Sequence, residues 1–216
     1  MSLSLTEYHP SGATAATDSI LAIGSPGEDL AVGDAPNPDA GRVILFRVTA
    51  AGAGSQLAEL KQGTADDVSG SAESGDRMGE TVTAINTAPR SVSTTATMKL
   101  AVGVPGEAVG SVAKAGAVHT FSLLGTPGAN DRWLEAGDGD GIPGAPGAGQ
   151  AVGSSVHFTG TSLYVGMPNG PSTYGALHAL PLSNVTAGGT VAAVTTYQPG
   201  TGGLPAAGSR FGYAAR

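Results

Sequence analysis

The chain is organised as short apolar runs, rich in Val, Ile and Leu, that alternate with segments rich in Gly, Pro, Ser and Asp. Runs of this length between turn residues are typical of β-strands. No stretch of ten or more residues combines helical spacing with capping residues, so the pattern predicts an all-β protein. The expected strands fall into four classes, which are 78–85, 152–158 and 211 onward; 20–24, 99–103 and 163–166; 43–48, 118–123 and 177–182; and 56–60, 132–135 and 191–197.

Two short sequence motifs, called words below, recur in the same order as these strands. The second class carries Leu-Ala-Ile-Gly-Ser-Pro-Gly-Glu at 21–28, and the third class begins with Gly-Arg-Val-Ile-Leu-Phe at 41–46. Related words return at 100–107 and 163–170 for the second class, and at 116–121 and 175–180 for the third. A fixed order of strand words repeated along a chain indicates one supersecondary unit that is used several times.

The third strand class predicts how these units pack. Val43, Ile44, Leu45 and Phe46 make both faces of its first copy apolar, and a strand buried on both sides reads as a continuous apolar run. Small sheets stacked face to face around an axis bury their strands in this way. The pattern therefore favours a β-propeller of four-stranded antiparallel blades. A β-sandwich is the alternative, but its strands should alternate more cleanly, and it does not explain the repeat.

The same words resemble FG-GAP repeats of the bacterial type, the units of the propeller at the head of integrin α subunits. Phe211-Gly212 matches the family's Phe-Gly element in full, whereas Met78-Gly79 and Val152-Gly153 keep only the glycine. The run Ala-Glu-Ser-Gly-Asp-Arg-Met-Gly at 72–79 resembles the Ala-Glu-x-Gly-Asp-Arg-Phe-Gly run of bacterial members. The family's Gly-x-Pro element is matched at 24–26, 103–105 and 166–168. The resemblance implies an integrin-like, extracellular or secreted module of the kind used in cell adhesion.

One departure from the family pattern concerns calcium. The family places an Asp-rich loop between its first and second strands, because Ca²⁺ needs several oxygen ligands on one tight turn. Here those places hold 86–97 and 159–162, which contain no carboxylate. Calcium binding is therefore not carried over to these units, and no cofactor is expected.

A second departure concerns the number of units. The resemblance covers about three blades, with units at roughly 1–70, 71–144 and 145–204 and the start of a further blade at 205–216. An arc of three blades is not expected to close, and it leaves sheet faces or edges exposed. We therefore expect further blades from the rest of a longer chain or from self-association.

Composition excludes several partners. The 216 residues carry a formal net charge of −7, which argues against nucleic acid because phosphate binding needs a basic face. There is no run of about 18 apolar residues that could cross a bilayer, and the first ten residues lack the pattern of a signal peptide. Cysteine is absent, so disulfides and thiolate metal sites are excluded.

Two features resemble functional motifs. Gly-Asp-Gly-Asp-Gly at 137–141 looks like a calcium turn and makes Asp138 and Asp140 metal candidates, but it aligns with a linker between units, where a flexible turn is the simpler interpretation.

His119 and His178 share one position of the third strand, which indicates a half-buried structural site. No catalytic residue is predicted, and the chain is not expected to be an enzyme.

Acidic residues gather on one face of the expected propeller. In the integrin-like arrangement, the loops that join second and third strands share a face with the linkers between blades. The acidic residues that fall there are Glu28, Asp29, Asp34, Asp39, Asp66, Asp67, Glu73, Asp76, Asp138 and Asp140. Loops on a rigid scaffold are the usual place for recognition, although solvation of a turn-rich surface explains the same pattern. The candidate ligand-binding residues are Glu28, Asp29, Asp34, Glu107, Asn169 and Tyr174.

Together these observations favour a non-catalytic binding or scaffold module that recognises a protein or glycan through its loop face. Two alternatives stay open at this point. The first alternative is an accessory propeller of a secreted hydrolase whose catalytic domain lies outside the chain. The second is a purely structural repeat.

Overall fold

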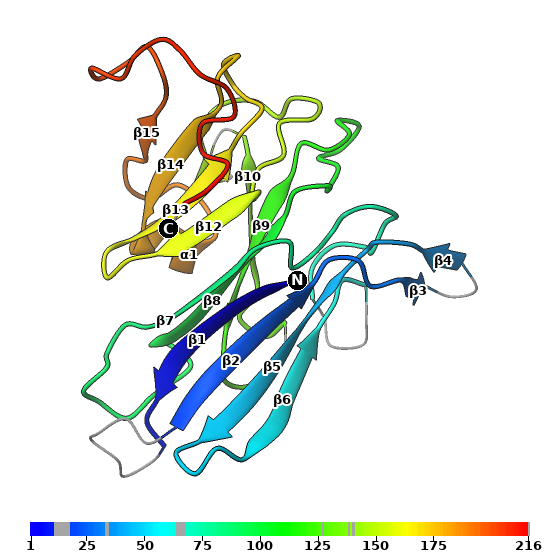
Figure 1. The fold of residues 1–216 in the computed structure, drawn as a ribbon, viewed down its shortest axis with the longest axis vertical. Helices are drawn as coiled ribbons and strands as arrows, with labels where there is room; N and C mark the ends of the chain where they lie inside the picture. The colour runs from blue at the N-terminus through cyan, green and yellow to red at the C-terminus, as the bar shows by residue number, and fades with distance from the viewer. Residues whose placement is uncertain are drawn as a thin grey trace.

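The computed structural model describes residues 1–10, 18–32, 35–63, 68–126, 128–137, 139 and 141–215. Over these residues the chain folds into three main β-sheets, a two-stranded hairpin and one short helix (Figure 1). Pairing within the main sheets is antiparallel, apart from the short parallel pair of β10 with β11. No sheet in this part of the chain closes on itself.

Each main sheet contains strands of the predicted second, third and fourth classes in that order, and the second sheet has a fifth strand, β11, that was not predicted. The first sheet has the order β1-β2-β5-β6, formed by β1 (Ser2–Tyr8), β2 (Asp18–Ser25), β5 (Arg42–Thr49) and β6 (Gly54–Leu60). The second sheet has the order β11-β10-β9-β8-β7, formed by β7 (Val82–Asn86), β8 (Met98–Val104), β9 (Ala117–Ser122), β10 (Arg132–Ala136) and β11 (Gly141–Ile142). The third sheet has the order β12-β13-β14-β15, formed by β12 (Ser155–Phe158), β13 (Ser162–Met167), β14 (Ala176–Pro181) and β15 (Thr195–Tyr197). The hairpin of β3 (Leu30–Val32) and β4 (Ala35–Asn37) lies between β2 and β5, and α1 (Leu182–Ala187) follows β14.

The predicted second and third strands are confirmed in all three sheets, and the differences lie elsewhere. The N-terminal residues, for which no strand was predicted, form β1, the first strand of the first sheet. The first strands of the other two sheets start later than expected, because the chain turns at Gly79 and Gly153, whose φ angles are +86° and +82°. The strand expected from Phe211 onward is seen only as a bridge to Gly175.

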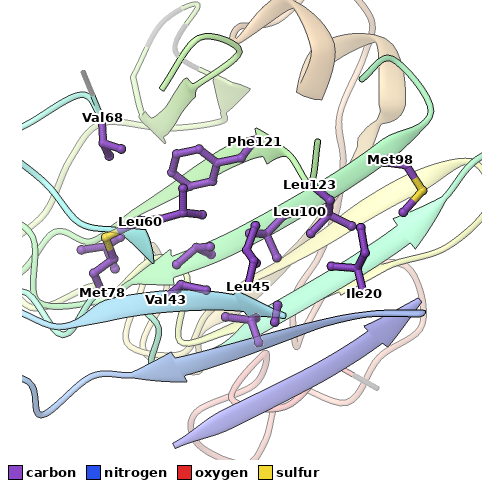
Figure 2. Close-up of a cluster of buried hydrophobic side chains, with 14 residues drawn as sticks. Ile20, Val43, Leu45, Leu60, Val68, Met78, Met98, Leu100, Phe121 and Leu123 are labelled. Atoms are coloured by element: carbon purple, nitrogen blue, oxygen red, sulfur yellow. The ribbon is translucent and has the colours of Figure 1, made fainter. Parts of the chain in front are cut away.

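The second sheet packs between the other two, and each boundary has its own apolar core. We call the contact of the first with the second sheet the first boundary, and that of the second with the third sheet the second boundary. The core of the first boundary includes Ile20, Val43, Leu45 and Leu60 from the first sheet and Leu100, Val102 and Phe121 from the second (Figure 2). The core of the second boundary includes Ala101, Val118 and Leu134 from the second sheet and Val156, Leu163, Val165 and Leu180 from the third.

The expectation that third-class strands are buried on both faces is correct for β9 and wrong for β5. Five consecutive residues of β9, Ala117 to Phe121, are buried. In β5, Val43 and Leu45 are buried, but Ile44 and Phe46 on the other face are only half-buried. The reason is position, because β9 lies in the middle sheet, whereas the first sheet has a neighbouring sheet on one face only in the described structure (Figure 1).

Successive sheets meet through one repeated contact. Gly24, at the end of β2, approaches the backbone carbonyl of Gly79 so closely that a Cβ atom at residue 24 would overlap it. The hydroxyl of Ser2 donates a hydrogen bond of 2.9 Å to the same carbonyl. The equivalent sets are Gly103, Gly153 and Thr81 in the second sheet, and Gly166, Gly212 and Ser155 in the third. The glycine of the Gly-x-Pro word is therefore needed for the packing of one unit on the next.

The first strands of the three sheets lie side by side. The Oγ of Ser4 in β1 accepts the backbone N–H of Ala84 in β7 at 2.9 Å. One sheet further along, the Oγ1 of Thr83 in β7 accepts the backbone N–H of Phe158 in β12 at 3.1 Å. Hydroxyl side chains on one first strand thus satisfy backbone donors on the next, so these strands stay in contact without forming a continuous sheet.

Candidate functional site

In the first and second sheets, the loops between the second and third strands share one backbone scheme. In the first sheet, the N–H of Glu28 donates to the carbonyl of Ser25, and the N–H of Gly41 donates to the carbonyl of Glu28. Glu107 of the second sheet makes the same two bonds, to Val104 and from Gly116. Glu28 and Glu107 are therefore structural equivalents, and any difference between them comes from what surrounds their side chains.

Glu28 lies on a partly exposed cluster of charges. The guanidinium of Arg42 pairs with Glu28 at 3.0 Å and with Glu59 at 2.8 Å, and Lys61 lies 3.8 Å from Glu59. The hydrogen bond from Arg42 holds the pKa of the Glu59 carboxyl below its usual range. Asp29 is committed in part to its own loop, because its Oδ1 accepts the backbone N–H of Asp39 at 3.0 Å.

These charges surround a cavity of about 310 Å³, which we call the loop-face cavity. Its lining includes Glu28, Asp29, Arg42, Glu59 and Lys61. The Nε of Arg42 is buried and has no hydrogen-bond partner within the described structure, so a donor stays unsatisfied at the edge of this cluster. The cavity thus combines carboxylate acceptors with cationic donors, which suits a polar ligand with both kinds of group.

Glu107 lies inside the first boundary and not on the exposed loop surface. Its side chain is only 7 % exposed, and its Oε2 accepts a hydrogen bond of 2.9 Å from the Nε2 of Gln62. Burial raises the pKa of Glu107 to about 7, with a smaller contribution from the nearby carboxyl of Asp76. Burial also raises the pKa of Asp76 to about 6, although a backbone N–H from Glu73 opposes the shift. Glu107 therefore connects two sheets, a position that the loop pattern alone did not predict.

The remaining candidates are spread over other parts of the chain. Asn169 is exposed, and its Nδ2 donates to the carbonyl of Gly149 at 3.0 Å. Tyr174 is half-buried, and its carbonyl accepts the N–H of Phe211 at 2.6 Å. Neither residue lines the loop-face cavity. Asp34, Asp138 and Asp140 lie outside the described residues.

Arg42, Glu59 and Lys61 were not among the predicted site residues. Arg42 could have been found from the repeat, because the equivalent positions of the third-strand word hold Ala117 and Ala176. A cation at a position that is alanine in both other units departs from the structural requirement of the repeat. Glu59 and Lys61 lie on or just after the fourth strand, whose pattern is too weak to give such a comparison.

The two histidines of the third strand are fully buried rather than half-buried. The Nδ1 of His119 lies 2.8 Å from the Oδ1 of Asp131, whose Oδ2 accepts the backbone N–H of Ser69 at 2.7 Å. Burial alone would raise the pKa of Asp131, but the bonds from His119 and Ser69 lower it overall. The imidazole also stacks on Phe121 at 5.4 Å between ring centroids. This network holds the first boundary together and leaves the ring enclosed.

His178 is the equivalent residue of the third sheet. Its Nδ1 lies 3.0 Å from the Oγ1 of Thr196, and burial lowers its pKa to about 4, so it is neutral at pH 7. The shared position is therefore a core position in both sheets. A hydroxyl in one unit and a carboxylate in the other satisfy the same ring nitrogen.

Comparisons with known proteins add no relative. A scan against protein-family models and a search of curated proteins found no match to this chain. Within the described residues, no group of three or more His, Asp or Glu side chains is placed to hold a metal ion. Within the same residues, the structure has no helix that is long and apolar enough to cross a membrane.

Proposed function

We propose that the chain is an arc of a β-propeller built from FG-GAP-like units, with the three main sheets as successive blades. Three repeated features support this arrangement: the shared strand order, the glycine contact between units and the adjacent first strands. Residues of β1, β7 and β12 line an open groove of about 630 Å³ together with Tyr213. In a propeller this groove corresponds to the central axis, because the first strand of every blade lies there.

The proposed role is non-catalytic recognition of an extracellular protein or glycan through the loop face. The observation that carries it is the loop-face cavity, in which Glu28 and Asp29 lie beside Arg42. The carboxylates can accept hydrogen bonds from sugar hydroxyls or peptide N–H groups. The guanidinium can donate to the oxygens of the same ligands. The cavity is carried by loops that the stacked sheets hold in place, which is a common arrangement for recognition surfaces.

This proposal is tested with arrays of printed glycans and of immobilised peptides, each probed with the fluorescently labelled chain. We expect binding to one class of spot, weakened about tenfold or more by Glu28→Gln combined with Asp29→Asn, because charge-assisted hydrogen bonds are lost. The Asn at residue 29 keeps an oxygen that can accept the N–H of Asp39. Glu80→Gln, which removes a partly exposed carboxyl paired with Arg77, is the matched control. Absence of binding to any spot, or equal binding by both variants, contradicts the proposal.

A structural role is a second candidate, favoured by the open face of the first sheet. Strand register places Leu3, Ile23 and Ile44 in one row of this face, and Leu5, Leu21 and Phe46 in the next. Leu3 and Leu5 are 58 % and 61 % exposed. The equivalent rows of the second sheet, Val102 with His119 and Leu100 with Phe121, are buried.

We propose that another unit of the same repeat covers this open face, since the first boundary already buries the equivalent face of the second sheet. In a preparation of the purified chain, the unit must come from a second copy. Light scattering is expected to show association that Leu3→Lys with Leu5→Lys abolishes, because two charges then enter the contact. Val191→Lys, at a 65 % exposed residue in the loop that bonds to Asn184 of α1, should leave association intact. A wild-type chain that stays monomeric at its highest soluble concentration refutes this role.

A further inference from the structure

The two boundaries between sheets differ at three equivalent positions. The glycine rows define the equivalence, because Gly24 is paired with Val43 in the first sheet as Gly103 is with Val118 in the second. The first sheet places apolar side chains at the three positions, namely Ile20, Leu45 and Ala58. The second sheet places polar or cationic side chains there, namely Lys99, Thr120 and Arg132. One copy of the repeat has therefore exchanged core-forming side chains for hydrogen-bond donors.

A cavity of about 200 Å³ lies where these three residues meet α1. Besides Lys99, Thr120 and Arg132, its polar lining includes Ser122, Asn130 and Thr186. The stem of Arg132 packs against Gly188, just after α1, so the side chain is held at the cavity edge. The helix itself is fixed by the buried Val185, whose carbonyl accepts the Thr120 hydroxyl at 3.5 Å.

The positive charge of this cavity has no counter-ion in the described structure. Lys99 is half-buried, and its ammonium makes no hydrogen bond or ion pair with any described residue. Arg132 donates from Nη1 to the backbone carbonyl of Asp131. The carboxylate of Asp131 is occupied by His119 and by the N–H of Ser69, and the cavity lining contains no acidic residue. Burial lowers the pKa of Lys99, so the ammonium is poorly solvated and would gain from an anionic partner.

We propose that this cavity is a binding site for a small oxyanion, either a free anion or the phosphate, sulfate or carboxylate group of a larger ligand. Lys99 supplies a point charge, Arg132 supplies a planar fork of donors, and the hydroxyl of Ser122, which accepts the backbone N–H of Leu124 and keeps its own O–H, supplies a further donor. The cavity is smaller than the sites that enclose drug-sized molecules, which matches a single anionic group. The site is separate from the loop-face cavity, with which it shares no residue.

The test is a nuclear magnetic resonance titration of the uniformly ¹⁵N-labelled chain with sodium phosphate, sodium sulfate or sodium acetate. Sodium chloride at matched ionic strength provides the background. Saturable shifts at the amides of Thr120, Ser122 and Val185 are expected with at least one oxyanion and not with chloride. Phosphate or sulfate alone indicates a tetrahedral anion, and acetate alone indicates a carboxylate.

Two variants restore the side chains of the first sheet, Lys99→Ile and Arg132→Ala. Each should weaken the anion about tenfold or more, because a charge-assisted contact is lost. Lys114→Gln removes the same charge from an exposed turn and should leave the affinity unchanged. Because Arg132 is exposed, its replacement decides the result even if Lys99→Ile fails to fold. Shifts that never saturate, or an equal loss of affinity in Lys114→Gln, overturn the proposal.

Discussion

The first and second boundaries are built on the same backbone scheme but place their polar groups at opposite ends. The first boundary is apolar at Ile20 and Leu45, and its buried polar links run from Gln62 to Glu107, near the loop end, and from His119 to Asp131. The second boundary has Gly170 at the position equivalent to Glu107, and its polar residues surround the cavity at Lys99. The comparison shows which positions the repeat constrains and which it leaves free.

The constrained positions are those of the glycine contact, because a backbone atom of the next unit occupies the space of a side chain. The free positions lie further along the strands, where the sheets can either bury apolar side chains or separate around a small cavity. At the second boundary α1 fills part of this space with Val185. Variation in a repeat protein is thus concentrated where packing allows it, and the candidate binding groups lie there too.

Gly103→Ala should have the largest effect. Both boundaries use a glycine contact of the same kind, and this change disrupts the one at the second boundary. The new Cβ would overlap the backbone carbonyl of Gly153, and backbone cannot move aside as a flexible side chain can. We expect the free energy of unfolding to fall by about 4 kcal/mol, near the upper end for one residue. Gly54→Ala, with no atom within 4 Å of the new Cβ, should change it by less than about 0.5 kcal/mol. Urea denaturation of both variants measures the difference, and equal midpoints would show that the contact is not required.

Leu45→Thr tests whether the first boundary tolerates the polar residue that the second carries at Thr120. Leu45 is 2 % exposed, so the change leaves a small void and buries a hydroxyl at the same time. We expect a loss of about 3 kcal/mol in the free energy of unfolding. Leu57→Thr, at a residue 44 % exposed in the same sheet, should lose less than about 0.5 kcal/mol. If both variants lose the same small amount, the two boundaries are interchangeable and the comparison fails.

Much of the fold could be predicted because the repeat marks its own strands. The second and third strands lie between glycines that packing requires, so their positions are visible in one sequence. β1 was missed although Leu3 and Leu5 alternate with Ser4 and Thr6 in the pattern of a half-buried strand. The signal was short, and no repeated word accompanied it. Sheet membership was therefore clear only from its pairing with β2.

α1 could not be predicted, because tertiary contacts stabilise it more than its sequence does. It has six residues and no side-chain cap at its N-terminus, and so short a helix is marginal by itself. The buried side chain of Asn184 accepts the N–H of Ala192 at 2.8 Å and donates to its carbonyl at 2.8 Å. These bonds fold the following loop back onto the helix. They depend on residues whose proximity the sequence pattern did not show.

The candidate site was predicted only in part for a similar reason. Glu28 and Asp29 follow from their place in the loop, but the buried contact of Glu107 depends on Gln62, which lies just after β6 of the first sheet. The cationic cavity could not be predicted from the strand that contains Lys99 alone. Lys99 is unusual only in comparison with Ile20, the apolar residue at the equivalent position of the first sheet.

Glu107→Gln is expected to have the smallest effect, and it tests the polar link of the first boundary. The pKa of Glu107 is raised from 4.5 to about 7, so between these pH values the folded chain keeps a proton that the unfolded chain has released. Stability from this group is therefore highest at low pH, falls as pH rises from about 4.5 to 7, and is constant above that. Glutamine has no charge to bury and keeps an oxygen for Gln62. At pH 8 the variant should gain on the order of 1 to 2 kcal/mol over the wild type, and the gain should vanish near pH 4. Urea denaturation at both pH values measures it, with Glu7→Gln, at a side chain 39 % exposed, as the control. A gain that is the same at both pH values would mean that the carboxyl of Glu107 is not kept neutral by the first boundary.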